Sequence, residues 1–255
     1  MIDIHSHILY GIDDGPSTRE DTIKMLENAV KEGITEIIST SHAYHPQYHA
    51  EATSVKQQLI TLQQEMDEQQ IPLKLHIGHE VRLRDNIVDL LKEQKILTLA
   101  GSKYLLLELP SQGIPKYTTH VIHALLSENI LPVIAHPERN RAIAENPARL
   151  TKLISNGAIA QITAGSLAGH FGRGVQKLSL QLVDANLVHT YGSDVHNLKT
   201  RAYKFDAGLR YLEKQKRLDA VDIFLENNAR IVENDEVIIL EPEDLGKPKW
   251  WNIFA

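Results

Sequence analysis

What the 255-residue sequence lacks excludes several kinds of function. It contains no cysteine, which rules out disulfide bonds, thiolate metal sites and a cysteine nucleophile. No apolar run approaches the roughly 20 residues of a membrane-spanning helix, so we expect no transmembrane segment. Acidic residues (33) outnumber Lys and Arg (27), and the resulting net charge of −6 provides no general basic surface for nucleic acid.

Histidine, by contrast, is abundant, with 13 residues. The hydrophobic share of 42% and the charged share of 24% are ordinary for a globular protein. The first predicted strand begins at residue 2, which leaves no room for a signal peptide, and we expect a cytoplasmic protein. No linker, low-complexity segment or internal repeat divides the chain, so residues 1–255 are predicted to form one domain with an irregular tail over about 233–255.

Apolar runs alternate with amphipathic stretches along the chain. After the first strand, further strands are predicted over residues 34–40, 73–77, 104–107, 130–135, 158–163 and 187–191. Helices are predicted near residues 17–32 (with capping-box spacing at Ser17 to Glu20), 51–69, 84–94, 116–128, 147–156, 174–185, 202–213 and 217–227. Seven strand–helix units in strict alternation predict an α/β fold with a parallel sheet, either open or closed into a barrel.

Metal-ligating residue types follow nearly every predicted strand. His5 and His7 are two residues apart at the end of the first strand, so their imidazoles project to the same side. Asp194 and His196 repeat this spacing after the last strand. Glu108 interrupts an apolar run, where an unpaired buried carboxylate would be costly. The full set of candidate ligands is His5, His7, Asp14, His42, Glu80, Glu108, His136, Asp194 and His196.

These positions favour the barrel over the open sheet. A (β/α) barrel brings the carboxyl ends of its strands together into one site, whereas an open sheet would spread them too widely. Each residue has a simpler alternative, such as a helix cap for His42 or a solvated carboxylate for Glu80, but the coincidence of nine at one face indicates a polynuclear metal site. Seven other histidines are interpreted without a metal: His76 and His189 as core or helix-facing residues within strands, and His120 and His123 as surface helix residues. His45, His49 and His170 are expected on loops at the active face, exposed to solvent with substrate contact as the alternative.

The chain resembles the PHP (polymerase and histidinol phosphatase) superfamily, and within it the capsule-operon protein-tyrosine phosphatases of the CpsB/CapC type. The motifs that carry the resemblance extend over almost the full length: the opening DIHSHIL with DDG, GHE at 78–80, PVIAHPERN at 132–140, QITAGSLAGHFG at 161–172 and SDVHNLKTR at 193–201. This resemblance implies a distorted seven-stranded (β/α) barrel that binds three divalent metals, commonly manganese, at the carboxyl ends of its strands.

By position, the resemblance implies one metal held by His5, His7, Glu80 and Asp194, a second by Glu80, Glu108 and His136, and a third by Asp14, His42 and His196. Spacing does not decide between Asp13 and Asp14, and Asp14 is chosen by analogy. The mixture of imidazole and carboxylate also suits iron or zinc. Arg139 resembles the family's phosphate-binding arginine, with Arg201 a weaker second candidate. The alternative for Arg139 is a structural salt bridge to a neighbour such as Glu138 or Glu145.

The implied reaction is hydrolysis of phosphotyrosine by water that the metals activate, since no cysteine is present. The implied partner is an autophosphorylating bacterial tyrosine kinase that has a tyrosine-rich C-terminal tail and controls capsular or extracellular polysaccharide synthesis. Alternatives are a small-molecule phosphatase of the histidinol-phosphatase type, a nuclease and a non-catalytic metal-binding module. Trp250 and Trp251 lie in the tail, which either covers the domain or docks near a membrane.

Overall fold

The computed structural model describes residues 1–243. The tail with Trp250 and Trp251, for which the sequence left packing and docking open, lies outside the described residues. Within residues 1–243 the helices are α1 (Arg19–Lys31), α2 (Ala52–Glu68), α3 (Ile87–Lys92), α4 (Thr118–Ser127), α5 (Arg141–Glu145), α6 (Ala148–Ser155), α7 (Ala164–Leu167), α8 (Arg173–Asp184), α9 (Phe205–Lys214) and α10 (Leu218–Glu233), with 3₁₀ turns η1 (Leu99–Gly101) and η2 (Pro137–Arg139).

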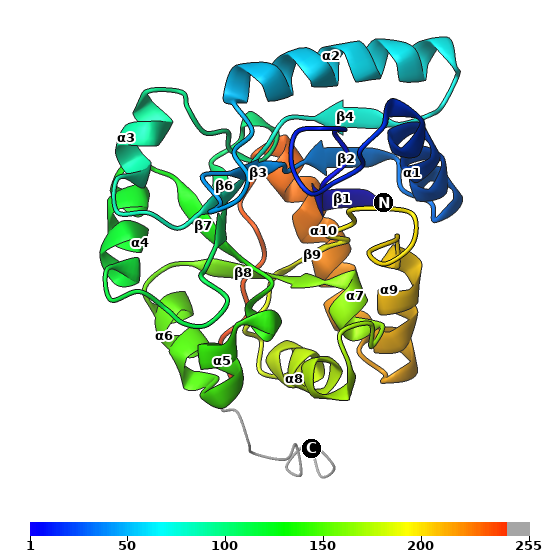
Figure 1. Cartoon of the computed structure of the whole chain (residues 1–255). Helices are drawn as coiled ribbons and strands as arrows, with labels where there is room; N and C mark the ends of the chain where they lie inside the picture. Colours follow the sequence, from blue (N-terminus) through cyan, green and yellow to red (C-terminus); the bar gives the residue numbers. More distant parts are fainter. Residues whose placement is uncertain (244–255) are drawn as a thin grey trace.

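The strands form two parallel sheets that curl into a half-barrel, with helices on the outside (Figure 1). One sheet has the order β1-β2-β4 and the other β3-β5-β6-β7-β8-β9. Their bounds are β1 (Ile2–Ser6), β2 (Glu36–Ser39), β3 (His42–Ala43), β4 (Lys74–His76), β5 (Glu80–Arg82), β6 (Tyr104–Glu108), β7 (Leu131–Ala135), β8 (Ile159–Thr163) and β9 (Thr190–Gly192).

The predicted α/β architecture with parallel strands is confirmed, but the strand count differs from the predicted seven. The strands predicted over 34–40 and 73–77 are observed as β2 and β4, but each is followed by a short strand that was not predicted, β3 and β5. The chain passes from one sheet to the other between β2 and β3 and again between β4 and β5. A side chain at Gly78 would place its Cβ only 2.8 Å from Ile38, so glycine is required where this segment approaches β2. β3 and β5 are two and three residues long and begin at polar residues predicted to follow the strands, so the apolar pattern did not reveal this change of sheet.

The helix boundaries also depart from the predicted ones. α5 was not predicted, and α10 continues to Glu233, beyond the predicted end at residue 227. α1 is capped by Thr18, whose hydroxyl accepts a hydrogen bond from the Asp21 N–H (3.2 Å), and not by the predicted pair of Ser17 and Glu20. Within residues 1–243 no helix is both long and apolar enough to cross a membrane.

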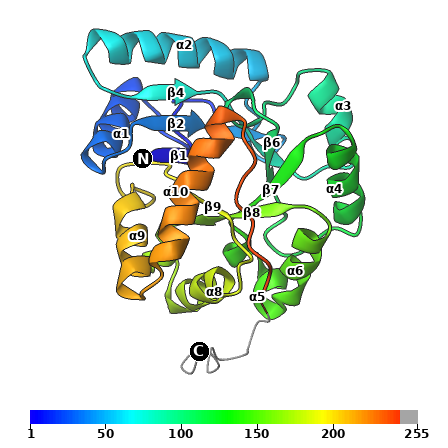
Figure 2. The same ribbon diagram turned by 180° about the vertical axis from the view of Figure 1, so that it is seen from behind.

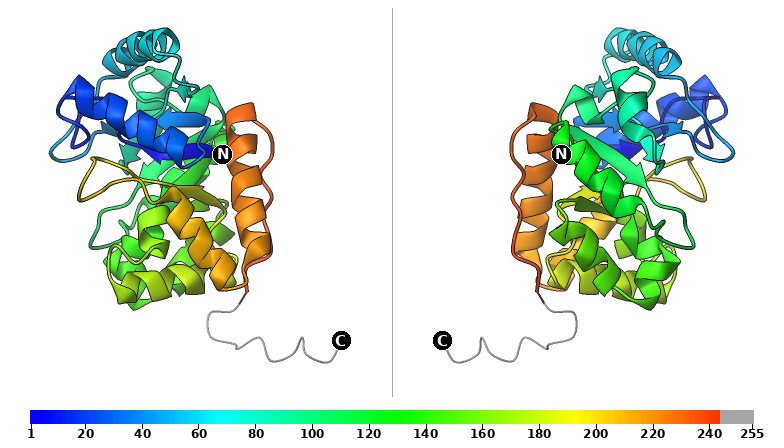
Figure 3. Two further views of the ribbon diagram at one scale, coloured as in Figure 1. Left: turned by 90° about the vertical axis from the view of Figure 1, so that its right-hand side faces the viewer. Right: turned by 90° about the vertical axis from the view of Figure 1, so that its left-hand side faces the viewer.

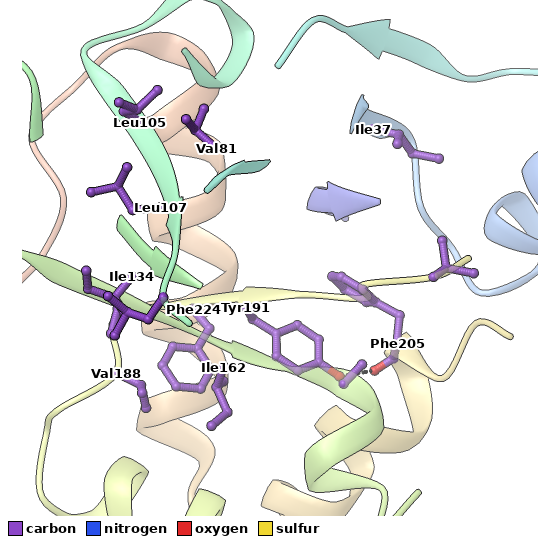
Figure 4. Packing of buried hydrophobic residues seen from close by; sticks show 14 of the residues in the cluster. Ile37, Val81, Leu105, Leu107, Ile134, Ile162, Val188, Tyr191, Phe205 and Phe224 are labelled. Atoms are coloured by element: carbon purple, nitrogen blue, oxygen red, sulfur yellow. Dashed lines mark hydrogen bonds between the residues drawn. The ribbon is translucent and has the colours of Figure 1, made fainter. Parts of the chain in front are cut away.

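Strand periodicity divides the core into two clusters. Leu105 and Leu107 on β6 contribute to the large cluster beneath the helices, whereas Leu106 between them belongs to a smaller cluster with Ile4. Figure 4 shows the large cluster continuing past Ile134 to Tyr191, whose hydroxyl donates to the Phe205 carbonyl (2.6 Å). These apolar layers hold the strand ends in place.

α10 covers the side of the sheets opposite the loops that follow the strands (Figures 2 and 3). Its Asn228 is completely buried, and the side-chain amide donates to the carbonyls of Ile2 (2.8 Å) and Tyr191 (2.7 Å) while its oxygen accepts from the Tyr191 N–H (3.2 Å). One asparagine therefore connects β1 and β9, which share no ladder of their own. A single bridge between Ser6 and Val195 joins their carboxyl ends.

Candidate metal centre

β1 delivers the first pair of candidate ligands to the interior of the molecule. His5 and His7 are both fully buried, and their Nε2 atoms lie 3.4 Å apart, as the spacing of two residues in a strand predicts. The outer nitrogen of each ring has its own partner: His5 Nδ1 donates to Gln161 Oε1 (2.8 Å), and His7 Nδ1 donates to Asp13 Oδ2 (2.8 Å). These bonds leave both Nε2 atoms facing the same space.

The residues after β9 form a second pair beside the first. Asp194 has a left-handed backbone (φ 53°), a conformation that costs energy outside glycine and is typical of functional sites. His196 Nδ1 donates to the Asp194 carbonyl (3.0 Å), which again leaves Nε2 toward the centre. Buried Asp3 ties this segment to β1, because its carboxylate accepts from the Ser193 hydroxyl (2.6 Å) and N–H (2.9 Å). Burial raises the pKa of Asp3 to about 6.

Glu80, at the start of β5, occupies the middle of the cluster. Its Oε2 lies 3.2 Å from His42 Nδ1, 3.3 Å from His7 Nε2 and 3.5 Å from His5 Nε2. Its Oε1 lies 2.7 Å from Nε2 of His136, which also has a left-handed backbone (φ 34°). Although burial opposes it, the surrounding imidazoles hold the pKa of Glu80 well below its usual value. Glu80 is therefore an ionised carboxylate with no access to bulk water.

The geometry separates the roles of Asp13 and Asp14. Asp13 uses its carboxylate to accept from His7 Nδ1 and from the N–H groups of His42 (2.9 Å) and Gly15 (3.0 Å). Asp14 Oδ1 instead faces the cluster, 3.4 Å from His42 Nε2 and 3.3 Å from His196 Nε2. Asp14 can therefore face a metal while Asp13 orients a ligand.

Together the nine predicted residues fall into three overlapping groups, each compact enough for one ion: His7, Asp14, His42 and His196; His5, His7, Glu80 and Asp194; and Glu80, Glu108 and His136. The groups share His7 and Glu80. Most members are buried, but the side chains of Asp14 (31% exposed) and His136 (15% exposed) lie at an open edge. The centre is thus accessible from one side.

Unsatisfied buried atoms at the centre fit the binding of cations. Asp14 Oδ1, His42 Nδ1, Asp194 Oδ1 and His196 Nε2 are all buried without a hydrogen bond. Such atoms are rare in native proteins, and each is a metal-ligand type that a divalent ion would satisfy. Burial, against the pull of nearby carboxylates, lowers the pKa of His196 and of His42 to about 4, so both rings are neutral at pH 7, as coordination requires.

The carboxylates also make the centre attractive to positive charge. Although burial lowers it, the charges of Glu80 and Asp194 raise the pKa of His5 well above its ordinary value. In the same way, Asp13 and Glu80 overcome burial and raise the pKa of His7 to about 9. Protons on these rings occupy the places that cations would take, and bound metal would release them.

Two arginines converge on the centre through Asp194. Arg139 Nη2 and Arg201 Nη2 each lie 2.6 Å from Asp194 Oδ2. Arg139 thus forms a salt bridge, as its alternative interpretation supposed, but the partner is Asp194 and not Glu138 or Glu145. Glu138 is buried and accepts from the hydroxyls of Thr163 (2.8 Å) and Ser166 (2.6 Å), while Glu145 pairs with Arg141 (2.9 Å). The Arg139 guanidinium also stacks over the Phe171 ring, 4.9 Å from its centroid.

Several supporting residues were missed by sequence reasoning. Gln161 orients His5, and its own amide is fixed by the Ile162 carbonyl. Arg82 pairs with Glu108 (3.1 Å). Gln161 and Arg82 occupy strand positions that face the site, so strand alternation was the one available signal, but alternation alone does not show which polar residue touches a ligand.

Of the other histidines, His120 and His123 are exposed on α4, and His189 is buried, as predicted. His76 is partly buried on β4 and pairs with Glu36 (2.7 Å). His49 and His170 are exposed loop residues. His45 differs from the expected solvent exposure, because its half-buried ring stacks on His42 with 4.6 Å between centroids.

Comparison of the whole chain with known proteins identifies its family. A structure reported as YwqE from Bacillus subtilis and CpsB from Streptococcus pneumoniae, "unique metal-dependent tyrosine phosphatases", superposes with a TM-score of 0.94 at 38% identity, covering 97% of this chain and 100% of that one. Tyrosine-protein phosphatase YwqE of B. subtilis is 38% identical over the full length of both chains. Tyrosine-protein phosphatase CpsB of S. pneumoniae is 29% identical, covering 91% of this chain and 98% of its own.

A more distant match shares the fold alone. A β-aspartyl dipeptidase from Fervidobacterium islandicum is 13% identical with a TM-score of 0.54, covering 96% of this chain and 75% of its own. The family model for capsular polysaccharide synthesis, CpsB/CapC, matches residues 1–233. The resemblance seen in the sequence motifs is therefore confirmed, and the chain belongs to the CpsB/CapC family.

Proposed function

We propose that the chain is a metal-dependent protein-tyrosine phosphatase. The observation that carries the proposal is the convergence of three overlapping ligand groups and two arginines on one accessible edge. A phosphate monoester is negatively charged and so suits both the ligand groups and the arginines, because metal cations and guanidinium groups each stabilise phosphate oxygens. The relatives' names and the capsular polysaccharide family support the same activity.

We further propose three divalent ions, manganese in the first instance, at the three residue groups. The ions would activate water and stabilise negative charge on the phosphate oxygens. Glu80 would be the shared carboxylate of two groups, and His7 belongs to two groups as well. The outer hydrogen bonds of His5, His7 and His196 fix each ring before any ion binds.

The arginines would hold the phosphate. Arg139 and Arg201 contact the same Asp194 oxygen from separate elements, so each guanidinium is already directed at the edge of the centre. A guanidinium can bind two phosphate oxygens at once and keeps its charge at any working pH. The tyrosyl oxygen leaves as a phenolate with a pKa of about 10, so a dedicated general acid is not required.

The proposed physiological partner is an autophosphorylating bacterial tyrosine kinase whose C-terminal tail is rich in tyrosine, with both proteins in the cytoplasm. The family's association with capsular polysaccharide synthesis supports a substrate from that process. The absence of cysteine requires that hydrolysis proceed without the cysteinyl-phosphate intermediate of other tyrosine phosphatases.

A substrate panel tests the proposal. Protein reconstituted with Mn²⁺ is assayed with a phosphotyrosine peptide, histidinol phosphate and single-stranded DNA. We expect phosphotyrosine to be hydrolysed with the highest kcat/KM and the other two to react weakly or not at all. Preferential hydrolysis of histidinol phosphate would instead establish a small-molecule phosphatase, and cleavage of DNA a nuclease.

A further inference from the structure

A cavity of about 220 Å³ opens beside the metal centre, between the loop that follows β6 and the turn that follows β7. Its lining includes Glu108, His136 and Arg139, which belong to or face the candidate metal centre, so we take their side of the cavity as its inner end. Pockets for drug-sized ligands measure roughly 300–1,000 Å³, so this cavity suits a group the size of a single aromatic ring. It adjoins both the group of Glu80, Glu108 and His136 and an arginine directed at the centre.

The remaining walls of the cavity are mostly uncharged. Leu109 and Ala135, each less than 5% exposed, form apolar parts of its wall. Ser111 lies at the exposed mouth. A charged inner end with an apolar wall complements a flat, apolar group that carries a phosphate at one end.

The cavity is preformed by the residues around it. Asn140 donates its side-chain amide to the carbonyls of Pro110 (2.8 Å) and Gly113 (3.1 Å), and its oxygen accepts from the Ile143 N–H (3.1 Å). The Arg141 N–H donates to the Ser111 carbonyl (2.9 Å). These bonds attach the loop over residues 110–113 to the start of α5, so a ligand would not have to order the loop.

We infer that this cavity receives the tyrosyl ring of the substrate and selects aryl phosphates over small acyl or alkyl phosphates. The inference rests on the proposed phosphatase function, since a phosphate held by Arg139 lies at the inner end of the cavity. The organic group esterified to that phosphate then lies next to the cavity. Selection follows because an aromatic ring gains apolar contacts with Leu109 and Ala135 that a small substituent does not.

The test narrows the mouth of the cavity without touching its inner end. Ser111→Trp is compared with Gln112→Trp, a neighbouring exposed position whose side chain approaches Arg141 and does not line the cavity. For each Mn²⁺-reconstituted protein, kcat/KM is measured for phenyl phosphate and for acetyl phosphate. We expect the aryl-to-acyl ratio to fall at least tenfold in Ser111→Trp and to stay within twofold of the parent in Gln112→Trp.

A binding measurement separates this inference from the proposed function. Calorimetry compares phenylphosphonate with methylphosphonate, neither of which is hydrolysed, in the parent, Ser111→Trp and Leu109→Ala. We expect the preference for phenylphosphonate to shrink at least fivefold in both variants. If the parent hydrolyses neither phosphate ester, the proposed function fails and this binding preference alone decides the cavity's role. An unchanged preference in both variants would overturn the inference, as would an unchanged kinetic ratio in Ser111→Trp.

Discussion

At the scale of single residues, orientation of the candidate ligands depends on neighbours that hold no metal themselves. Gln161 and Asp13 each occupy one ring nitrogen of a histidine, and the Asp194 carbonyl occupies that of His196. Each bond fixes the orientation of the ring so that Nε2 faces the centre. Substitution of such a residue disturbs metal binding by reorienting a ring and not by removing a ligand.

Arg139 can be tested separately from the metals. We expect Arg139→Ala to lower kcat/KM for phosphotyrosine by roughly 10²–10³-fold, the scale of one preorganised electrostatic contact to the transition state. Arg139→Lys should recover only part of this loss, because a point charge cannot make a two-pronged contact. Metal content should be unchanged, since Arg201 still pairs with Asp194 (2.6 Å). Steady-state kinetics and elemental analysis measure the two quantities.

Arg141 provides the matched control for Arg139. It lies two residues along the chain, is exposed, and pairs only at the surface with Glu145 and Gln112. Arg141→Ala should leave kcat/KM near that of the parent. Near-normal kcat/KM in Arg139→Ala together with a lower Tm would mean that Arg139 is only a structural partner of Asp194.

At the scale of secondary-structure elements, the junction between β1 and β9 is the critical one. Both pairs of i, i+2 candidate ligands lie at the ends of these two strands, yet the strands share no ladder: their carboxyl ends are joined by the bridge at Ser6 and Val195 and by the bonds of Asp3 to Ser193. Asn228 on α10 connects the two strands from the opposite side. The relative position of the two pairs therefore depends on a residue on the opposite side of the strands.

Removal of this connection should be costly. Asn228→Ala leaves the buried backbone groups of Ile2 and Tyr191 without their partner, at roughly 1–3 kcal/mol for each unsatisfied group, so we expect the free energy of unfolding to fall by about 3 kcal/mol or more. Thermal and denaturant unfolding measure the change. Glu226→Ala on the same helix, which loses only an exposed pair with Arg230, should change stability by about 0.5 kcal/mol or less. Equal, small effects for both variants would contradict the role given to Asn228.

At the scale of the whole molecule, the candidate metal centre connects both sheets. Its candidate ligands come from β1 and the loop after it, β3, β5, β6 and the segments after β7 and β9. Ions that bind only the folded chain stabilise it by mass action. Without bound ions, several buried carboxylate and imidazole atoms at the centre have no hydrogen-bond partner.

Metal removal should therefore affect activity and stability together. Chelation is expected to abolish phosphatase activity and to lower Tm, and Mn²⁺ should restore both. Glu80→Ala should lose more than one equivalent of metal, because Glu80 belongs to two groups, whereas His196→Ala should lose mainly one. His170→Ala, at an exposed loop position, serves as the control. Unchanged metal content in both ligand variants, or full activity in a metal-free sample, would refute the assignment.

Much of this site could be predicted from local patterns. The alternation of side chains along a strand places His5 beside His7, and a ligand-type residue at the end of one parallel strand is expected near those at the ends of the others. Helix positions and the parallel α/β class follow from periodicity in the same way. None of these predictions requires knowledge of which residues far apart in the sequence are in contact in the fold.

Only the tertiary structure determined the features that depend on contacts between residues far apart in the sequence. Asp13 and Asp14 are equivalent in the sequence, and only the positions of His7 and His42 separate their roles. The partner of Arg139 is Asp194, 55 residues along the chain, and not its sequence neighbours. The change of sheet after β2 and after β4, and the connection made by Asn228, likewise arise from contacts between distant segments, because the packing of the fold is set by all its elements at once.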